Sequence, residues 1–136
     1  MRITLTTVGL AILAAASFAQ IKNAPTSTTQ PSPFACDRLA LSAEARARHF
    51  NELGPQLRDL KTGVRELANG YAFQFPADPK TVLLVAEWAA GERLCCPFFD
   101  IDIRLEPEHG SMWLTLTGRD GTKEFIKADA PSWIRP

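Results

Sequence analysis

The chain has 136 residues, 46% of them hydrophobic, with 15 basic and 15 acidic side chains that give a formal net charge of zero. This length fits one globular domain and leaves little room for a second. The balanced charge offers no basic surface, which excludes nucleic acid as an expected partner. A charged fraction of 22% and eight Phe residues argue against a disordered chain.

The first residues have the pattern of a secretory signal peptide. Arg2 precedes an apolar run over residues 8–16, and Ser17 and Ala19 supply the small side chains expected before a cleavage site. The apolar run is too short for a membrane span. We therefore predict a signal peptide over residues 1–19, a periplasmic or secreted protein, and no membrane span after cleavage.

Composition divides the rest of the chain. Residues 20–35 are rich in Pro, Ser and Thr, which predicts an extended linker. Residues 36–130 carry the periodic hydrophobic patterns of one folded domain, and residues 131–136 are predicted to be a C-terminal tail.

The first half of the domain predicts a helix followed by a hairpin. Ser42 can cap a helix to residue 60, and Gly54-Pro55 should kink or split it. Residues 63–75 predict two strands joined at Asn69-Gly70, a strong turn signal. The apolar positions of the helix, at spacings of three and four, are Ala43, Ala47, Phe50, Leu53, Leu57 and Leu60.

The second half repeats this order. Pro79 can open a helix that ends near Cys95, because Pro97 removes the preceding residue from the helical region. Residues 99–105 and 112–117 alternate with period two, and a short helix follows over 120–127. The sequence therefore predicts an α+β domain of order α-β-β-α-β-β-α, with a four-stranded antiparallel sheet from two hairpins and helices on one face.

The candidate site lies where the second helix meets the third strand. Cys95 and Cys96 are adjacent thiols, and Glu92 precedes them by three and four residues on the last helical turn. Cys36 and His49 could complete a metal site with them. Thiolates prefer Zn, Cu or heavier thiophilic ions such as Hg. No C-x-x-C spacing supports this set.

Two other interpretations of the cysteines remain open. Cys36 could bridge to Cys95 or to Cys96 in an oxidising compartment, or the thiols could simply belong to the core. A catalytic cysteine is disfavoured, because the negative end of a helix opposes formation of a thiolate but suits a bound cation. The sequence thus favours binding over catalysis and assigns no reaction.

Residues 92–98, Glu-Arg-Leu-Cys-Cys-Pro-Phe, followed by Trp-Leu-Thr-Leu-Thr-Gly at 113–118 and Lys-Glu-Phe at 123–125, resemble a group of uncharacterised bacterial proteins. These proteins carry an ER-x-CCPF segment and then WLxLTG and KEF segments. Similar segments occur beside mercury-responsive regulators, so the resemblance implies a thiophilic-metal role. It implies no established activity and no catalytic residues.

We therefore expect a small exported domain that binds a soft metal ion through Cys95 and Cys96, assisted by Cys36 and by His49 or Glu92. The alternative is an interaction module held by a disulfide, without metal or catalysis. Its partner would be an unknown protein that contacts the outer sheet face near Trp113.

Overall fold

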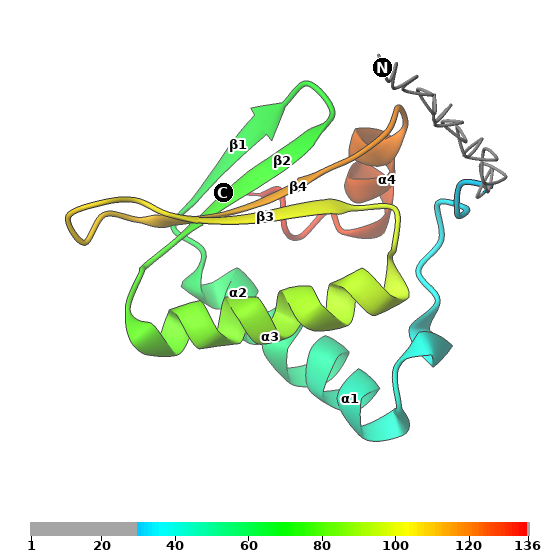
Figure 1. Cartoon of the computed structure of the whole chain (residues 1–136), viewed down its shortest axis with the longest axis horizontal. Coiled ribbons are helices and arrows are strands. Elements are labelled where there is room, and N and C mark those ends of the chain that lie inside the picture. Colours follow the sequence, from blue (N-terminus) through cyan, green and yellow to red (C-terminus); the bar gives the residue numbers. More distant parts are fainter. Residues whose placement is uncertain (1–29, 136) are drawn as a thin grey trace, which may run out of the picture.

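The computed structural model describes residues 30–135, so the predicted signal peptide and most of the predicted linker lie outside the described residues. The four strands form one antiparallel sheet in the order β1-β2-β4-β3, and the helices cover one face (Figure 1). The predicted α+β class and the antiparallel sheet are confirmed. The strands are β1 (Gly63–Leu67), β2 (Gly70–Phe75), β3 (Asp100–Leu105) and β4 (Met112–Thr117).

The helical segments precede, separate and follow the two hairpins, as the sequence predicts. The longest is α3, which runs alongside β3 on the helical side of the sheet, while α1 and α2 lie beside it (Figure 1). The segments are η1 (Arg38–Ala40), α1 (Ala43–Ala47), η2 (Arg48–Leu53), α2 (Gly54–Leu60), α3 (Pro79–Cys95) and α4 (Thr122–Asp129). Within residues 30–135, no helix is long and apolar enough to cross a membrane.

The first helical region is divided into α1, η2 and α2, and α2 begins at Gly54, where the sequence predicts a kink or a split. The backbone stays helical through Gly54-Pro55, and a wider π-helical turn, η2, precedes it. The Gly54 N–H donates to the His49 carbonyl, five residues earlier. Pro55 has no N–H to donate, so a local widening is a common way to absorb the lost bond. This turn directs both His49 and Leu53 into the interior.

The first hairpin forms, but its turn is one residue earlier than predicted. Leu67 pairs with Gly70, so Ala68 and Asn69 make the connection. Gly70 is required for a different reason, since a Cβ atom there would lie 2.0 Å from the Leu116 carbonyl oxygen of β4. The glycine therefore allows two strands to approach each other, which is a second common role for glycine in sheets.

The core lies between the sheet and the helices. Tyr71, Phe73 and Phe75 of β2 are buried, as their alternation predicts, and so are Met112, Leu114 and Leu116 of β4. They pack against buried side chains of α2, α3 and α4. On β3 the pattern weakens, because Ile103 and Leu105 are 37% and 54% exposed. The helices thus cover only the first part of this edge strand.

Both ends of the described chain contact the domain. Phe34, in the segment predicted to be a linker, lies 5.2 Å from the Phe98 ring and 6.2 Å from the Phe125 ring. Trp133, in the segment predicted to be a tail, is buried against Phe73 and Trp88. These contacts extend the packed unit at both ends of the predicted 36–130 domain.

We expect Gly70→Ala to lower the free energy of unfolding by about 2 kcal/mol or more, because the new methyl group forces β2 away from β4. Gly63→Ala is the matched control in the same hairpin. Its Cβ would lie 2.8 Å from the flexible amide end of Gln74 and 3.4 Å from the Gln74 Cβ, so it meets no backbone atom within this range. Urea unfolding compares the two variants, and equal stability would contradict the close approach at Gly70.

Candidate functional site

The two adjacent cysteines meet at the end of α3. Cys95 is the last residue of the helix, and Cys96 leaves it with φ −125° and ψ 67°. Pro97 imposes this change, because its ring disfavours helical geometry in the residue before it. Adjacent helical side chains would point about 100° apart, but this distorted end brings the two sulfur atoms to 3.7 Å.

Cys36 and Cys96 form a disulfide that spans 60 residues, with their Cα atoms 4.7 Å apart. Of the two bridges that the sequence leaves open, the structure contains the one to Cys96, while Cys95 is a free, buried thiol. The Asp37 N–H also donates to the Cys95 carbonyl, at 2.7 Å. The start of the folded chain is therefore tied to the end of α3 by a covalent bond and a hydrogen bond.

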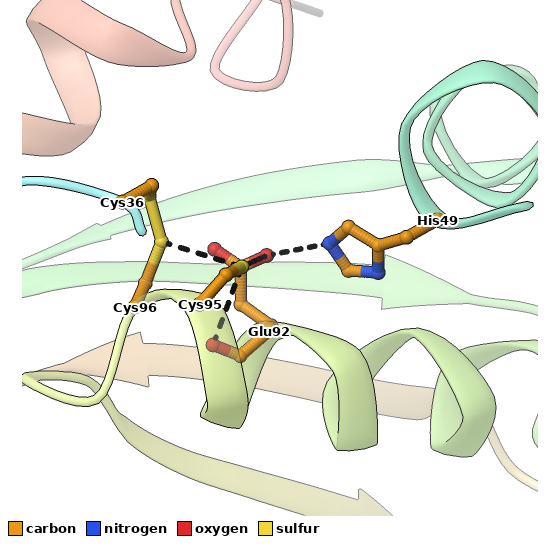
Figure 2. Close-up of polar contacts among 5 residues, drawn as sticks. All are labelled: Cys36, His49, Glu92, Cys95 and Cys96. Carbon is orange, nitrogen blue, oxygen red and sulfur yellow. Dashed lines mark hydrogen bonds and ion pairs between the residues drawn. A yellow bond between two sulfur atoms is a disulfide. The ribbon is translucent and has the colours of Figure 1, made fainter. Parts of the chain in front are cut away.

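A group of ligand-type atoms surrounds this junction. The sulfur atoms of Cys36, Cys95 and Cys96 and one carboxylate oxygen of Glu92 all lie within 4.8 Å of one another. The Cys95 sulfur is 3.8 Å from Glu92 Oε2 and 3.7 Å from the Glu92 carbonyl oxygen (Figure 2). Four of the five predicted site residues thus come together in a cluster whose residue types could hold a metal ion.

His49, the fifth predicted residue, lies just outside this cluster. Its Nε2 is 2.9 Å from Glu92 Oε2, so it contacts the candidate ligand rather than the sulfur atoms (Figure 2). The sequence places His49 at the border of an apolar stripe, whereas in the structure it is only 3% exposed. Its ring stacks on Trp88, with centroids 5.6 Å apart.

Gly91 leaves the space that the His49 ring occupies. A Cβ atom at Gly91 would lie 2.6 Å from His49 Nδ1, so only glycine leaves room for the imidazole beside α3. Nδ1 has no hydrogen-bond partner among the described residues. A neutral ring with its proton on Nε2, donated to the Glu92 carboxylate, leaves no buried donor unpaired. The imidazole therefore orients the carboxylate toward the sulfur atoms.

The environment of Cys95 keeps its thiol protonated. Burial, together with the charge and the hydrogen bond of the neighbouring Glu92 carboxylate, raises the pKa of Cys95 to about 12. Both causes disfavour the thiolate, since one removes water and the other adds a second negative charge. Cys95 is therefore a poor nucleophile in this state, in line with the sequence argument against a catalytic cysteine.

A cleft of about 570 Å³ opens onto the site. Cys36, His49 and Glu92 contribute to its lining, together with Arg38 and Arg58. Its aromatic residues come from segments far apart in the sequence: Phe34, Phe50, Trp88, Phe125 and Trp133. No local sequence pattern reveals this cleft, because only the folded chain brings these residues together. An isolated glycine in the helix, Gly91, is the one local signal of close packing here.

The outer face of the sheet carries the surface on which the alternative hypothesis depends. Trp113 is half-buried there, and the Arg65 guanidinium lies 4.4 Å from the centre of its ring. The tryptophan is thus partly covered by a side chain of its own chain.

Fold and site together define a small α+β domain with a disulfide beside a buried cysteine–glutamate cluster. Comparisons of the chain with family models, curated proteins and solved structures give no match. The resemblance of its ER-x-CCPF segment to a bacterial group stays a prediction.

Alkylation followed by intact-mass measurement tests the state of the three cysteines. At pH 8 we expect no added group on the folded protein, one on the denatured protein, and three after denaturation and reduction. A pKa of about 12 makes the thiolate fraction of folded Cys95 about 1000-fold lower than that of an ordinary thiol. Three groups on the denatured, unreduced protein would contradict the disulfide.

We expect Cys36→Ser to lower the free energy of unfolding by about 4 kcal/mol, the chain-entropy value for a loop of this length. Cys95→Ser is the control, because it keeps the disulfide and should cost clearly less. Urea unfolding without reductant measures both variants. If Cys36→Ser were as stable as the parent, the disulfide would not hold the fold.

Proposed function

We propose that the reduced form of this chain binds a soft metal ion through Cys95 and Cys96, with Cys36 and Glu92 as further ligands. The observation that carries the proposal is the distance of 3.7 Å between the two adjacent sulfur atoms. Two thiolates bound to one tetrahedral zinc ion at about 2.3 Å lie about 3.8 Å apart. The distorted helix end thus already holds the two sulfur atoms, one of them in the disulfide, at a spacing suited to one ion.

The surroundings support a cation at this point. Glu92 Oε2 lies 3.8 Å from the Cys95 sulfur, and the same oxygen is hydrogen-bonded to His49 Nε2. An outer group that hydrogen-bonds a ligating carboxylate, as His49 does to Glu92, is a common way to orient a metal ligand. The carboxyl end of α3 adds partial negative charge. Metal binding would release the Cys95 proton, so affinity should rise with pH.

The disulfide determines in which redox state Cys36 and Cys96 can act as metal ligands. While Cys36 and Cys96 are bonded to each other, neither sulfur is a thiolate. Opening the bond requires two electrons and two protons from a thiol reductant, which is itself oxidised to a disulfide. The proposed site is therefore complete only in the reduced protein, and metal binding should depend on redox state.

A second candidate function is an interaction module held together by the disulfide. The Cys36–Cys96 bond favours it, because the bond ties the first residues of the domain to the core without any metal. On this hypothesis the outer face near Trp113 would contact a protein partner. It predicts that reduction only destabilises the chain.

Zinc and Cu(I) titrations of reduced and oxidised protein test the metal hypothesis. The protein is reduced with a phosphine, and the phosphine is then removed under anaerobic conditions. The metal ion is titrated into the protein in the presence of a chromophoric chelator that competes for it. We expect one bound ion in the reduced parent and at least about 100-fold weaker binding in the oxidised parent, since two thiolate ligands are then missing. Co(II) should give thiolate charge-transfer absorption in the reduced protein alone.

Variants separate the ligands from their surroundings. Cys95→Ser/Cys96→Ser should abolish binding, Glu92→Gln should weaken it, and Arg93→Gln on the same turn should leave it unchanged. Circular dichroism shows that each variant is folded. Equal affinity of the double variant and the reduced parent would refute the proposed function, and absence of binding in the reduced parent would favour the interaction module.

A further inference from the structure

The two sulfur atoms of the disulfide differ in their access to solvent. Cys96 is 0% exposed and sits in a small apolar cluster with Leu41 and Phe98. Cys36 is half-buried and lines the 570 Å³ cleft, whereas Cys96 does not. A thiol must reach a sulfur atom to attack it. Of the two bonded cysteines, only Cys36 is open to a reagent in the folded protein, and the cleft is one route to it.

The cleft has the size of a small-molecule site. Ligand pockets of about 300–1,000 Å³ with apolar walls and a few polar groups are typical of proteins that bind small molecules. Here aromatic and polar side chains line the wall together, and the buried His49–Glu92 pair is among them. The Cys36 end of the disulfide thus faces a cleft that is open to solvent.

Charges of both signs line this cleft. Arg38 and Arg58 supply guanidinium groups, and Asp129 and Ser132 add a carboxylate and a hydroxyl. The Arg38 guanidinium lies 3.9 Å from the centre of the Phe50 ring, which fixes it on the cleft wall. Glu92 is already engaged by His49. A ligand that matches this lining carries carboxylates for the arginines and an ammonium group for Asp129.

We propose that the cleft binds a low-molecular-weight thiol of the amino-acid or short-peptide type, which opens the disulfide by attack on Cys36. The proposal rests on the proposed function in one respect, because opening the bond is what frees the Cys36 and Cys96 ligands. It assigns the cleft a ligand class, and it assigns Cys36 the role of the entry point for reduction.

The exchange proceeds in two balanced steps. The thiolate of the small molecule attacks Cys36 Sγ, forms a mixed disulfide with it, and expels the Cys96 thiolate, which takes a proton. A second thiol then attacks the sulfur of the bound small molecule and expels Cys36 as a thiolate, which also takes a proton. The sum consumes two small thiols and yields one small-molecule disulfide and two protein thiols.

Reduction kinetics of the intact protein without metal test this proposal. Glutathione, a zwitterionic peptide thiol, is compared with neutral 2-mercaptoethanol and cationic cysteamine. Each rate is divided by the rate with an unstructured reference disulfide, which cancels the intrinsic reactivity of each thiol. We expect the normalised rate with glutathione to be about tenfold higher than with either other thiol, because two exposed ion pairs stabilise its complex by about that factor. Its rate should also saturate with concentration.

Matched variants locate the effect. Arg38→Gln/Arg58→Gln should remove the preference for glutathione over 2-mercaptoethanol, whereas Arg104→Gln on β3 should leave that preference as it is in the parent. Mass spectrometry of the acid-quenched reaction should find the mixed disulfide on Cys36. Normalised rates that are equal for all three thiols, or a mixed disulfide on Cys96, would overturn the proposal.

The outcome does not depend on metal binding. Phosphine-reduced protein reports on the metal site without any thiol in the cleft, whereas reduction kinetics report on the cleft without any metal. Failure of the titration with a retained glutathione preference would refute only the metal function. The converse result would refute only the thiol site.

Discussion

The covalent bond between Cys36 and Cys96 is the constraint on which the other features of the site depend. It fixes the start of the described domain at the carboxyl end of α3, 60 residues away in the sequence. Phe34 then packs on Phe98 and Phe125 and forms part of the cleft wall. Without this bond the entropy of the N-terminal segment would oppose these contacts, since each ordered residue costs about 1–2 kcal/mol. The disulfide therefore stabilises both the fold and the shape of the cleft.

The buried pair of Glu92 and His49 is the second constraint. A carboxylate removed from water is costly unless hydrogen bonds compensate it, and His49 Nε2 supplies such a bond at 2.9 Å. The pair is possible because the π-helical turn directs His49 inward and because Gly91 leaves room for its ring. The buried His49–Glu92 pair thus requires a glycine in α3. Glycine lowers the stability of a helix by about 1 kcal/mol relative to alanine.

Local patterns predicted the fold more completely than the site. Pro79 and Pro97 mark the ends of α3 because proline restricts the backbone wherever it stands, and period-two alternation identified the buried face of β4. The pairing of Cys36 with Cys96 rather than Cys95 could not be predicted, because it depends on how the helix end turns. The burial of His49 and the cleft also escaped prediction, since they arise from contacts between segments distant in the sequence. The turn at Ala68 and Asn69 differs from the predicted Asn69-Gly70 because a tertiary contact of Gly70 outweighs its turn preference.

The proposed metal site and the disulfide use the same atoms and therefore exclude each other. Cys36 and Cys96 either hold the N-terminal segment by a covalent bond or serve as thiolate ligands, and the redox state of the surroundings decides between the two. A bound ion that bridged Cys36 to the adjacent cysteines would restore the same tie between chain start and helix end. The domain could then keep its N-terminal segment in place in both states. Cys95 takes no part in the disulfide, and its buried position beside Glu92 suits a ligand whose proton a metal ion displaces better than it suits a nucleophile.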